Sequence, residues 1–310
     1  MSNTTQTSEC TNQNITMQPI TIPIETKTIL AFVGGGERDE VILQTALAAA
    51  LPLSAHLDCL HAHVPSTMAA RHANLDFAHG DALKSALGRL RTDSDNFSVV
   101  AANHVRAFCA NAGIEMCDGP TGAQKVTATF FEEESNELEC LSSHASKREL
   151  VVMGRLRQKQ GLGQDTLEHI VRNSGRPVLT AGSAAPRTLT DTIMVCWKDA
   201  TSTAAAVTDA APLLAKARRV VFVSVAKRQG GLAAEMTATA RKLAGIEAEA
   251  QVIPPSRGGI PDTLAVAAEE YGANLLVIGA YGRSRGREIL FGSCTDKILA
   301  RSDRPILLRH

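Results

Sequence analysis

The residues from 279 to 293 have the types and the spacing that could bind a phosphate group. They read Gly279-Ala-Tyr-Gly282-Arg283-Ser284-Arg-Gly-Arg-Glu-Ile-Leu-Phe-Gly292-Ser293, which is a G-x2-G-x9-G-S pattern. Glycine has no side chain, so backbone N–H groups in such a loop can approach a ligand closely. The spacing differs from the P-loop and dinucleotide-binding patterns. A tight turn that binds no ligand is the alternative interpretation.

Two regular elements frame this loop and must position it. The apolar run at 275–278 is typical of a buried strand, and the segment 295–301 indicates a helix. The loop therefore connects the carboxyl end of a strand to a helix N-terminus, where unpaired N–H groups and the helix dipole favour an anion. Three arginines of the loop could pair with phosphates, although exposed charges often have no specific partner: Arg283, Arg285 and Arg287.

The same alternation of strands and helices occurs twice along the chain. In the first copy, we predict strands at 28–33, 56–64, 149–153 and 177–180, another strand within 114–131, and helices at 39–51, about 97–112, 134–145 and 166–172. In the second copy, we predict strands at 192–197, 220–225, 248–253, 274–278 and 305–308, and helices at 202–216, 232–243, 261–271 and 295–300. This alternation indicates parallel sheets that are covered on both faces.

Two pairs of matching segments support the repeat. The sequence LVVMGR at 150–155 matches LLVIGA at 275–280, and RPVL at 176–179 matches RPIL at 304–307. We therefore predict a first domain at 27–183 and a second at 188–310, with small residues linking them at 181–187. Residues 1–26 are rich in Ser, Thr, Asn and Gln, which is typical of a disordered leader.

Composition excludes several classes of protein. The 32 basic and 32 acidic residues give zero net charge, which disfavours a general nucleic-acid-binding protein. No apolar run approaches the roughly 18 residues that span a bilayer, and the N-terminus lacks the pattern of a secretory signal. The seven cysteines form no CxxC pair and no cluster with histidines, which favours reduced thiols in a cytoplasmic protein and no metal site. Cys294 differs from the others, because a thiol at a helix start can have a lowered pKa.

Catalytic residues are not indicated, and we predict none. His56, His61 and His63 lie on or beside one predicted strand without an evident carboxylate or cysteine partner, so we interpret them as strand-end or partly buried residues. Two further histidines are expected on helix surfaces: His144 and His169. The acidic run at 132–134 is interpreted as a solvated face at a helix start, where negative charge is favourable.

The second copy resembles the universal stress protein family. Nucleotide-binding members of that family carry G-x2-G-x9-G-(S/T) after the fourth strand of the domain, as at 279–293 here. The segment Val195-Cys-Trp-Lys-Asp-Ala200 and the helix at 205–214 are also similar to tandem members. The resemblance is strong over 188–310 and weak over 27–183.

This resemblance implies a fold and a ligand. The fold is α/β, with two tandem doubly wound domains of five parallel strands in the order 3-2-1-4-5, of the adenine nucleotide alpha hydrolase-like type. The ligand is ATP, alone or with Mg²⁺, in the crevice at the carboxyl ends of the strands. The residues that the resemblance places at the ligand are Val225 near adenine, Gly279 and Gly282 near the ribose and phosphates, Arg283 and Ser284 within the loop, and Gly292, Ser293 and Cys294 at the terminal phosphates.

One position departs from the family pattern. ATP-binding relatives usually carry an aspartate just after the first strand, whereas this chain has Lys198 there, beside Asp199. The departure weakens the expectation of adenine selectivity and affinity, but not the expectation of the phosphate site itself. A lysine could contact a phosphate there or pack elsewhere.

The first copy lacks the glycine pattern. Arg157 occupies the second glycine position, and Gln164 and Asp165 align with Gly292 and Ser293. An aspartate there would repel a phosphate, so we expect one nucleotide per chain. The glycines at 34–36 are a second candidate loop, for which a plain turn is the favoured interpretation.

Three classes of function remain at this stage. The favoured one is a nucleotide-binding regulatory or stress-response protein with little or no catalysis. The alternatives are a slow ATPase and a protein-interaction module that binds no nucleotide. The expected partners are an adenine nucleotide and, through exposed edge strands such as 305–308, a second copy of the chain; neither a nucleic acid nor a membrane is expected. The two halves of one chain could also pair through these strands.

Overall fold

The structure is a computed structural model that describes residues 27–63, 81–122, 124–155, 164–198, 201–227, 230–280 and 293–310. The predicted leader at 1–26 and most of the glycine loop lie outside the described residues.

The described part of the chain folds as alternating strands and helices in two halves. The first half contains β1 (Thr28–Phe32), α1 (Asp39–Ala50), the 3-10 helix η1 (Leu51–Leu53), β2 (His56–His63), α3 (Asp81–Ala112), β3 (Glu115–Met116), β4 (Thr127–Glu134), α4 (Glu137–Ala145), β5 (Leu150–Met153), α5 (Gln164–Asn173) and β6 (Val178–Thr180). The second half contains β7 (Thr192–Cys196), α6 (Thr201–Leu214), β8 (Arg219–Val225), α7 (Leu232–Ala244), β9 (Glu249–Ile253), α8 (Gly259–Glu270), β10 (Leu275–Gly279), α9 (Ser293–Arg301) and β11 (Ile306–Arg309).

The described strands form one continuous sheet in the order β3-β4-β2-β1-β5-β6-β11-β10-β7-β8-β9. Neighbouring strands within each half are parallel, and β6 pairs with β11 antiparallel at the junction. Counted along each half, the main strands follow the order 3-2-1-4-5, with the short β3 added outside β4. The predicted doubly wound α/β fold is therefore confirmed for both halves.

The final strand is not an edge of this sheet. β11 pairs with β10 on one side and with β6 on the other, where Leu308 lies opposite Val178 and Ile306 opposite Thr180. The two halves thus pair within the chain through their last strands, and among the described strands β3 and β9 are outermost. The expected use of strand 305–308 as an exposed edge was therefore wrong, and association of two chains through other edges stays a prediction.

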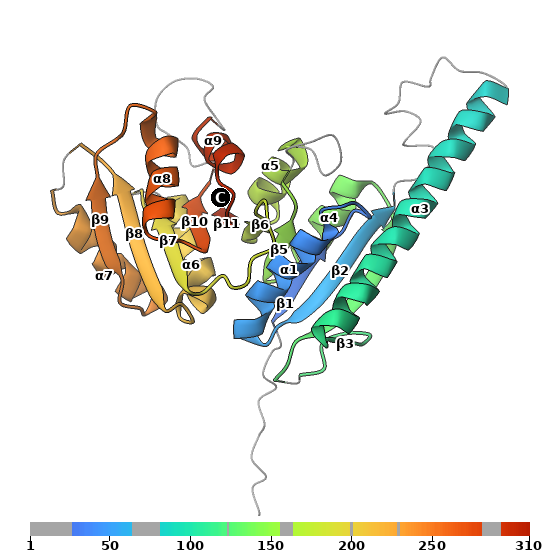
Figure 1. The fold of residues 1–310 in the computed structure, drawn as a ribbon, viewed down its shortest axis with the longest axis horizontal. Helices are drawn as coiled ribbons and strands as arrows, with labels where there is room; N and C mark the ends of the chain where they lie inside the picture. The colour runs from blue at the N-terminus through green and yellow to red at the C-terminus, as the bar shows by residue number, and fades with distance from the viewer. Residues whose placement is uncertain are drawn as a thin grey trace, which may run out of the picture.

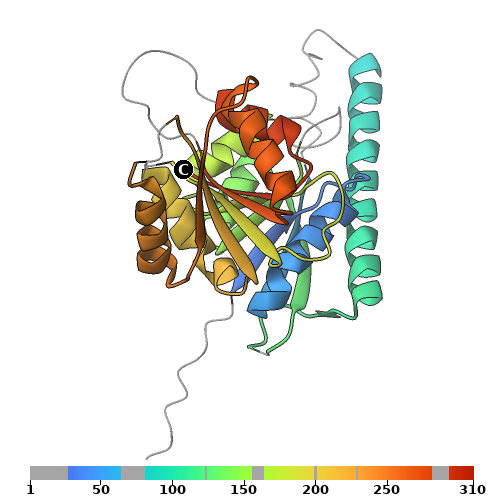
Figure 2. The same cartoon turned by 60° about the vertical axis from the view of Figure 1, so that its left-hand side comes forward.

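Helices cover both faces of the sheet (Figures 1 and 2). Apolar side chains of α1, α3, α6 and α7 belong to one core cluster, and those of α4, α5, α8 and α9 belong to the other. Each cluster continues from one half into the other, because the strands between them are apolar on both faces, as expected for parallel strands covered on both sides. Among the described helices, none combines the length and apolar character that crossing a membrane requires.

Two arginines of the first half hold the junction between the halves. The Arg155 guanidinium donates to the Leu299 carbonyl at 2.9 Å, to the Ser302 carbonyl at 2.7 Å and to the Arg304 carbonyl. It therefore satisfies carbonyl groups at the C-terminal end of α9, which have no partner within the helix. Arg38 donates to the Gly182 carbonyl at 2.5 Å and so holds the segment that follows β6.

Most boundaries agree with the sequence prediction to within a few residues, but the start of α3 and the assignment of the acidic run at 132–134 do not. Helix α3 begins at Asp81 rather than near Phe97, and its N-terminal part extends beyond the sheet in Figure 1. The segment 88–96 is polar and lacks the helical spacing of apolar residues that would have predicted a helix, because its described residues are mainly exposed to solvent. The acidic residues 132–134 end strand β4 instead of starting a helix, since the Asn136 side chain caps α4 two residues later.

Candidate functional site

The predicted ligand residues that the structure describes lie at the carboxyl ends of strands and at a helix start. Val225 is the last residue of β8, Gly279 is the last of β10, and Ser293 and Cys294 begin α9. Parallel strands of one sheet have their carboxyl ends at the same edge, where ligands bind in open α/β sheets. The other predicted ligand residues lie outside the described residues: Gly282, Arg283, Ser284 and Gly292.

Gly279 has a packing role in addition to its predicted place near a ligand. A Cβ atom at Gly279 would lie 2.4 Å from the backbone N of Thr203 and 2.6 Å from the carbonyl carbon of Ser202. The end of β10 therefore packs directly against the first turn of α6. Only glycine permits this approach, which brings the N-terminus of α6 to the same edge as β10.

Charged and thiol groups gather beside the start of α9. Partial burial raises the pKa of the Cys294 thiol, although electrostatic interactions with Lys198 and Lys297 act in the opposite direction. The helix start therefore does not lower the pKa of this thiol below its usual value. Lys198 follows β7 and interacts electrostatically with Cys294 in the first turn of α9. The residue at which this chain departs from the family pattern therefore lies near the start of the predicted phosphate-binding helix.

Buried groups at the end of β7 support this edge. Burial raises the pKa of the Cys196 thiol to about 12, so the thiol stays protonated. Trp197, the only tryptophan in the chain, packs against Phe222 with 5.9 Å between ring centroids. Its indole N–H is buried and has no hydrogen-bond partner among the described residues. The tryptophan precedes Lys198 directly and can serve as a spectroscopic reporter for this edge.

The corresponding edge of the first half is closed by the chain itself. The backbone N–H groups of Gly34 and Gly35 each donate to the Asp39 carboxylate at 2.9 Å, and His104 Nδ1 lies 3.0 Å from the same carboxylate. Gly35 has a φ of 76°, and a Cβ atom there would lie 2.4 Å from the Phe97 carbonyl oxygen. The glycines at 34–36 are therefore a turn in which Asp39 holds the N–H groups of Gly34 and Gly35, as the sequence interpretation favoured.

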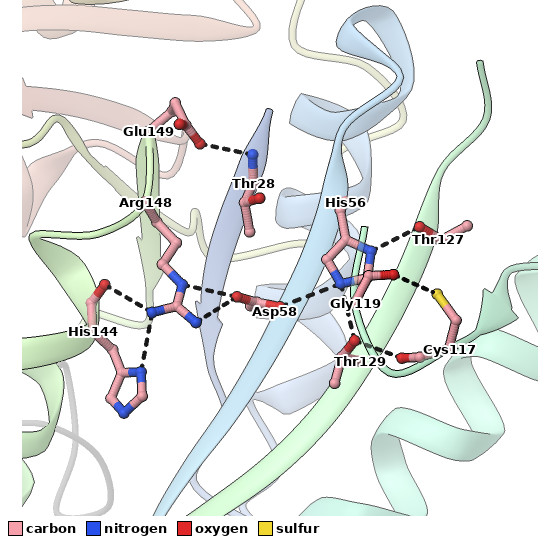
Figure 3. A network of polar contacts seen from close by, with 10 residues as sticks. All are labelled: Thr28, His56, Asp58, Cys117, Gly119, Thr127, Thr129, His144, Arg148 and Glu149. Atoms are coloured by element: carbon pink, nitrogen blue, oxygen red, sulfur yellow. Dashed lines mark hydrogen bonds and ion pairs between the residues drawn. The ribbon is translucent and has the colours of Figure 1, made fainter. Parts of the chain in front are cut away.

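A second polar cluster links β2, β4 and α4 (Figure 3). His56 lies 2.7 Å from the Thr127 hydroxyl and 3.3 Å from Asp58, and Arg148 donates to Asp58 at 2.8 Å. Arg148 also lies 3.1 Å from His144 Nδ1. Burial alone would raise the pKa of Asp58, but the bonds from His56 and Arg148 outweigh it and hold the pKa below its usual value.

This cluster corrects the sequence interpretation of the histidines. His56 and His61 are buried within β2, and His56 has Asp58 as a carboxylate partner two residues away on the same face of the strand. His144 is only 16% exposed and pairs with Glu133 at 2.8 Å. The i,i+2 spacing in β2 was a signal visible in the sequence, whereas the partners of His144 come from other elements.

The fold is that of a tandem doubly wound α/β protein. The residues at the carboxyl ends of its strands form a candidate ligand site in the second half. Residues 190–310 match the model of the universal stress protein family. These residues therefore form a domain that matches the universal stress protein family, as the resemblance implied.

Solved structures agree with this fold over nearly the whole chain. A universal stress protein from Archaeoglobus fulgidus DSM 4304 is 13% identical, with a TM-score of 0.61 and coverage of 91% of this chain and 95% of that one. A putative universal stress protein from Pseudomonas aeruginosa UCBPP-PA14 is 14% identical, with a TM-score of 0.55 and coverage of 92% and 93%. A functionally unknown protein from Pseudomonas aeruginosa PAO1 is 14% identical, with a TM-score of 0.54 and coverage of 92% of both chains. A search of curated proteins found no match.

Proposed function

We propose that the second half of this protein binds ATP or a related nucleotide and that binding regulates the protein's conformation or its choice of partner. One observation carries the proposal: the G-x2-G-x9-G-S spacing from Gly279 to Ser293 runs between the end of β10 and the start of α9. A loop of this kind offers backbone N–H groups, and the helix start adds unpaired donors and the positive end of its dipole.

The environment of Lys198 is consistent with an anionic ligand. Lys198 interacts electrostatically with Cys294 in the first turn of α9, and Lys297 acts on the same thiol. Two cations beside a helix N-terminus favour a phosphate group. Lys198 therefore acts on the phosphates, where relatives use an aspartate near the base or ribose. This assignment predicts that affinity depends more on the phosphate chain than on the base.

The first half is proposed to bind no nucleotide at its equivalent edge. Asp165 lies in the first turn of α5, the helix that corresponds to α9, and Asp39 already accepts the N–H groups of Gly34 and Gly35. A carboxylate in each of these places repels phosphate oxygens. The expected stoichiometry is one nucleotide per chain.

Calorimetric titration with ATP and Mg²⁺ tests the site. The wild type should bind one ATP, and Gly292→Asp should abolish binding by placing a carboxylate at the proposed phosphate position. Gly161→Asp, in the first copy, is a matched control that should bind like the wild type. Absence of binding in the wild type, or equal binding by Gly292→Asp, contradicts the proposed phosphate site.

Three further measurements separate the alternatives. Trp197 fluorescence should change on addition of ATP and much less on addition of adenosine, and Lys198→Gln should reduce that difference. A phosphate-release assay on the same samples distinguishes a binding protein from a slow ATPase, and we expect little or no release. Mass spectrometry of ligands that co-purify with the protein identifies the nucleotide, and their absence together with a silent titration favours an interaction module.

A further inference from the structure

We propose that Cys140, His144 and Glu133 form a site for a zinc-type divalent transition metal in the first half of the protein. One ligand atom from each of the three residues lies within 4.8 Å of the other two. The site is remote in the sequence from the proposed nucleotide loop. The inference does not rest on nucleotide binding.

The local structure brings the three side chains together from two elements. Cys140 and His144 are four residues apart on α4, and this spacing places them on one face of a helix. Glu133 lies near the end of β4, and its carboxylate is 2.8 Å from His144 Nε2. The expectation that no cysteine clusters with a histidine was therefore wrong for Cys140. The C-x3-H spacing is present in the sequence, which could not show that a strand supplies the carboxylate.

The spacing of the ligand atoms is close to what a metal requires. Tetrahedral zinc, with bonds of about 2.0–2.3 Å, holds its ligand atoms about 3.3–3.6 Å apart. The present 2.8 Å between the Glu133 carboxylate and His144 Nε2 would open by about half an ångström, and the thiol would move inward from at most 4.8 Å. Side-chain rotation can supply these movements, since the Glu133 side chain is 44% exposed.

The types of ligand favour zinc over calcium or magnesium. A thiolate, an imidazole nitrogen and a carboxylate oxygen are the ligands of zinc sites, whereas calcium and magnesium require oxygen ligands. Cys140 is 1% exposed and closes the inner side of the site, while Glu133 is partly exposed. The site therefore has three protein ligands and an outer position for water or another ligand, as in zinc sites that are not purely structural.

The surrounding network fixes His144 and defines the protons that move. The ring of His144 packs 5.1 Å from that of Phe131. An arginine can only donate, so Nδ1 of His144 accepts from Arg148 and Nε2–H donates to Glu133. On metal binding, Cys140 releases its thiol proton to solvent, the His144 proton moves from Nε2 to Nδ1, and Nε2 donates its electron pair to the metal.

The positive charge of Arg148 does not oppose the metal strongly. Its Nε and Nη2 atoms lie 2.8 and 2.7 Å from the Asp58 carboxylate, which compensates its charge. Arg148 gives up only its contact with His144 Nδ1, and its Nη1 atom keeps the carbonyl of His144 at 3.4 Å. The two anionic ligands, Cys140 and Glu133, then balance the charge of a divalent cation.

Cobalt substitution tests this site in the full-length protein, without nucleotide and with thiols kept reduced. The metal-free wild type is titrated with Co²⁺, and bound Co²⁺ is then displaced with Zn²⁺. We expect one Co²⁺ per chain, tetrahedral visible bands and a thiolate-to-cobalt charge-transfer band, all lost when Zn²⁺ is added. The absence of a thiolate band in the wild type would overturn the proposal.

Ligand and control variants locate the metal. Cys140→Ser should lose the charge-transfer band, and His144→Gln and Glu133→Gln should weaken binding of both metals. Cys117→Ser, which removes a thiol outside the cluster, should behave like the wild type. Persistence of the band in Cys140→Ser contradicts the site, as does its loss in Cys117→Ser. Circular dichroism shows whether each variant is folded, and Glu133→Gln, at a partly exposed side chain, tests the site even if Cys140→Ser fails to fold.

Discussion

Replacement of Gly279 by alanine should destabilise the second half strongly, before any effect on a ligand. The new Cβ atom would lie 2.4 Å from the backbone N of Thr203 and 2.6 Å from its Cα, whereas ordinary contacts are 3.4–4 Å. All the atoms that it meets belong to the backbone of α6, so no side-chain rotation relieves the overlap. The helix and the end of β10 must separate by about an ångström, the shortfall from normal carbon contact distances.

The repeat offers a matched control for this change. Gly154 follows β5 in the first half and corresponds to Gly279, but a Cβ atom there would meet only the flexible Ile42 side chain, at 3.1 Å. Overpacking against rigid neighbours costs about 3 kcal/mol, at the upper end of the usual range. Because alanine restricts the unfolded chain more than glycine does, the substitution also stabilises each variant by about 0.4–1 kcal/mol. We expect Gly279→Ala to lose about 2–3 kcal/mol and Gly154→Ala to stay within about 1 kcal/mol of the wild type.

Urea unfolding measures both values through Trp197, which follows the strand paired with β10. A lower midpoint for Gly279→Ala at an unchanged slope indicates a loss of native-state stability. Equal free energies of unfolding for the two variants would refute the packing argument. A stable Gly279→Ala protein that fails only to bind ATP would instead assign the glycine to ligand approach alone.

Three further predictions concern the junction, the polar cluster and the Cys294 thiol. Arg155→Ala should lower the free energy of unfolding by about 2–3 kcal/mol, because charge-assisted bonds to the end of α9 are lost. Arg155→Lys should recover part of the lost stability. An unchanged denaturation midpoint in Arg155→Ala would contradict this prediction. The pKa of Asp58 is lowered in the folded state, so its contribution to stability is present above its unfolded pKa of about 3.9 and is lost as pH falls through the folded value. Asp58→Asn should therefore be destabilising at neutral pH and should flatten the acid limb of a stability–pH curve, and a limb as steep as that of the wild type would count against this reasoning. The raised pKa of Cys294 predicts slow alkylation at neutral pH and faster alkylation as the pH rises. Lys198→Gln should slow the alkylation further, as measured by mass spectrometry of the labelled peptide. Faster labelling in Lys198→Gln would be inconsistent with the proposed interaction.

Much of the fold could be predicted from the sequence because its signals are local. Short apolar runs, such as Leu150–Met153 and Leu275–Gly279, are strands in the structure, as predicted, because strands covered on both faces must be apolar throughout. The repeated Arg-Pro turns before β6 and β11 are also local: in each, a serine side chain accepts from the backbone N–H of Arg176 or Arg304 at 3.2 Å. The alternation of strands and helices indicated parallel sheets, and the strand order was implied by the family resemblance.

Boundaries and partners depended on contacts distant in the sequence. The polar first part of α3 has no periodic signal, because most of its described residues face solvent instead of a core. The assignment of the acidic residues 132–134 to a helix was wrong because charge alone does not distinguish a strand end from a helix start. The intrachain pairing of β6 with β11 was one of two alternatives, and only the fold decided between them.

The sequence by itself determined the glycine–serine spacing between 279 and 293, the two copies and the missing phosphate pattern in the first copy. Those features are properties of residue type and distance along the chain. Only the tertiary structure decided that Gly279 contacts the start of α6, that Lys198 acts on Cys294, and that Glu133 meets Cys140 and His144. These pairings join separate strands and helices, so they arise only when the sheet forms and packs its helices.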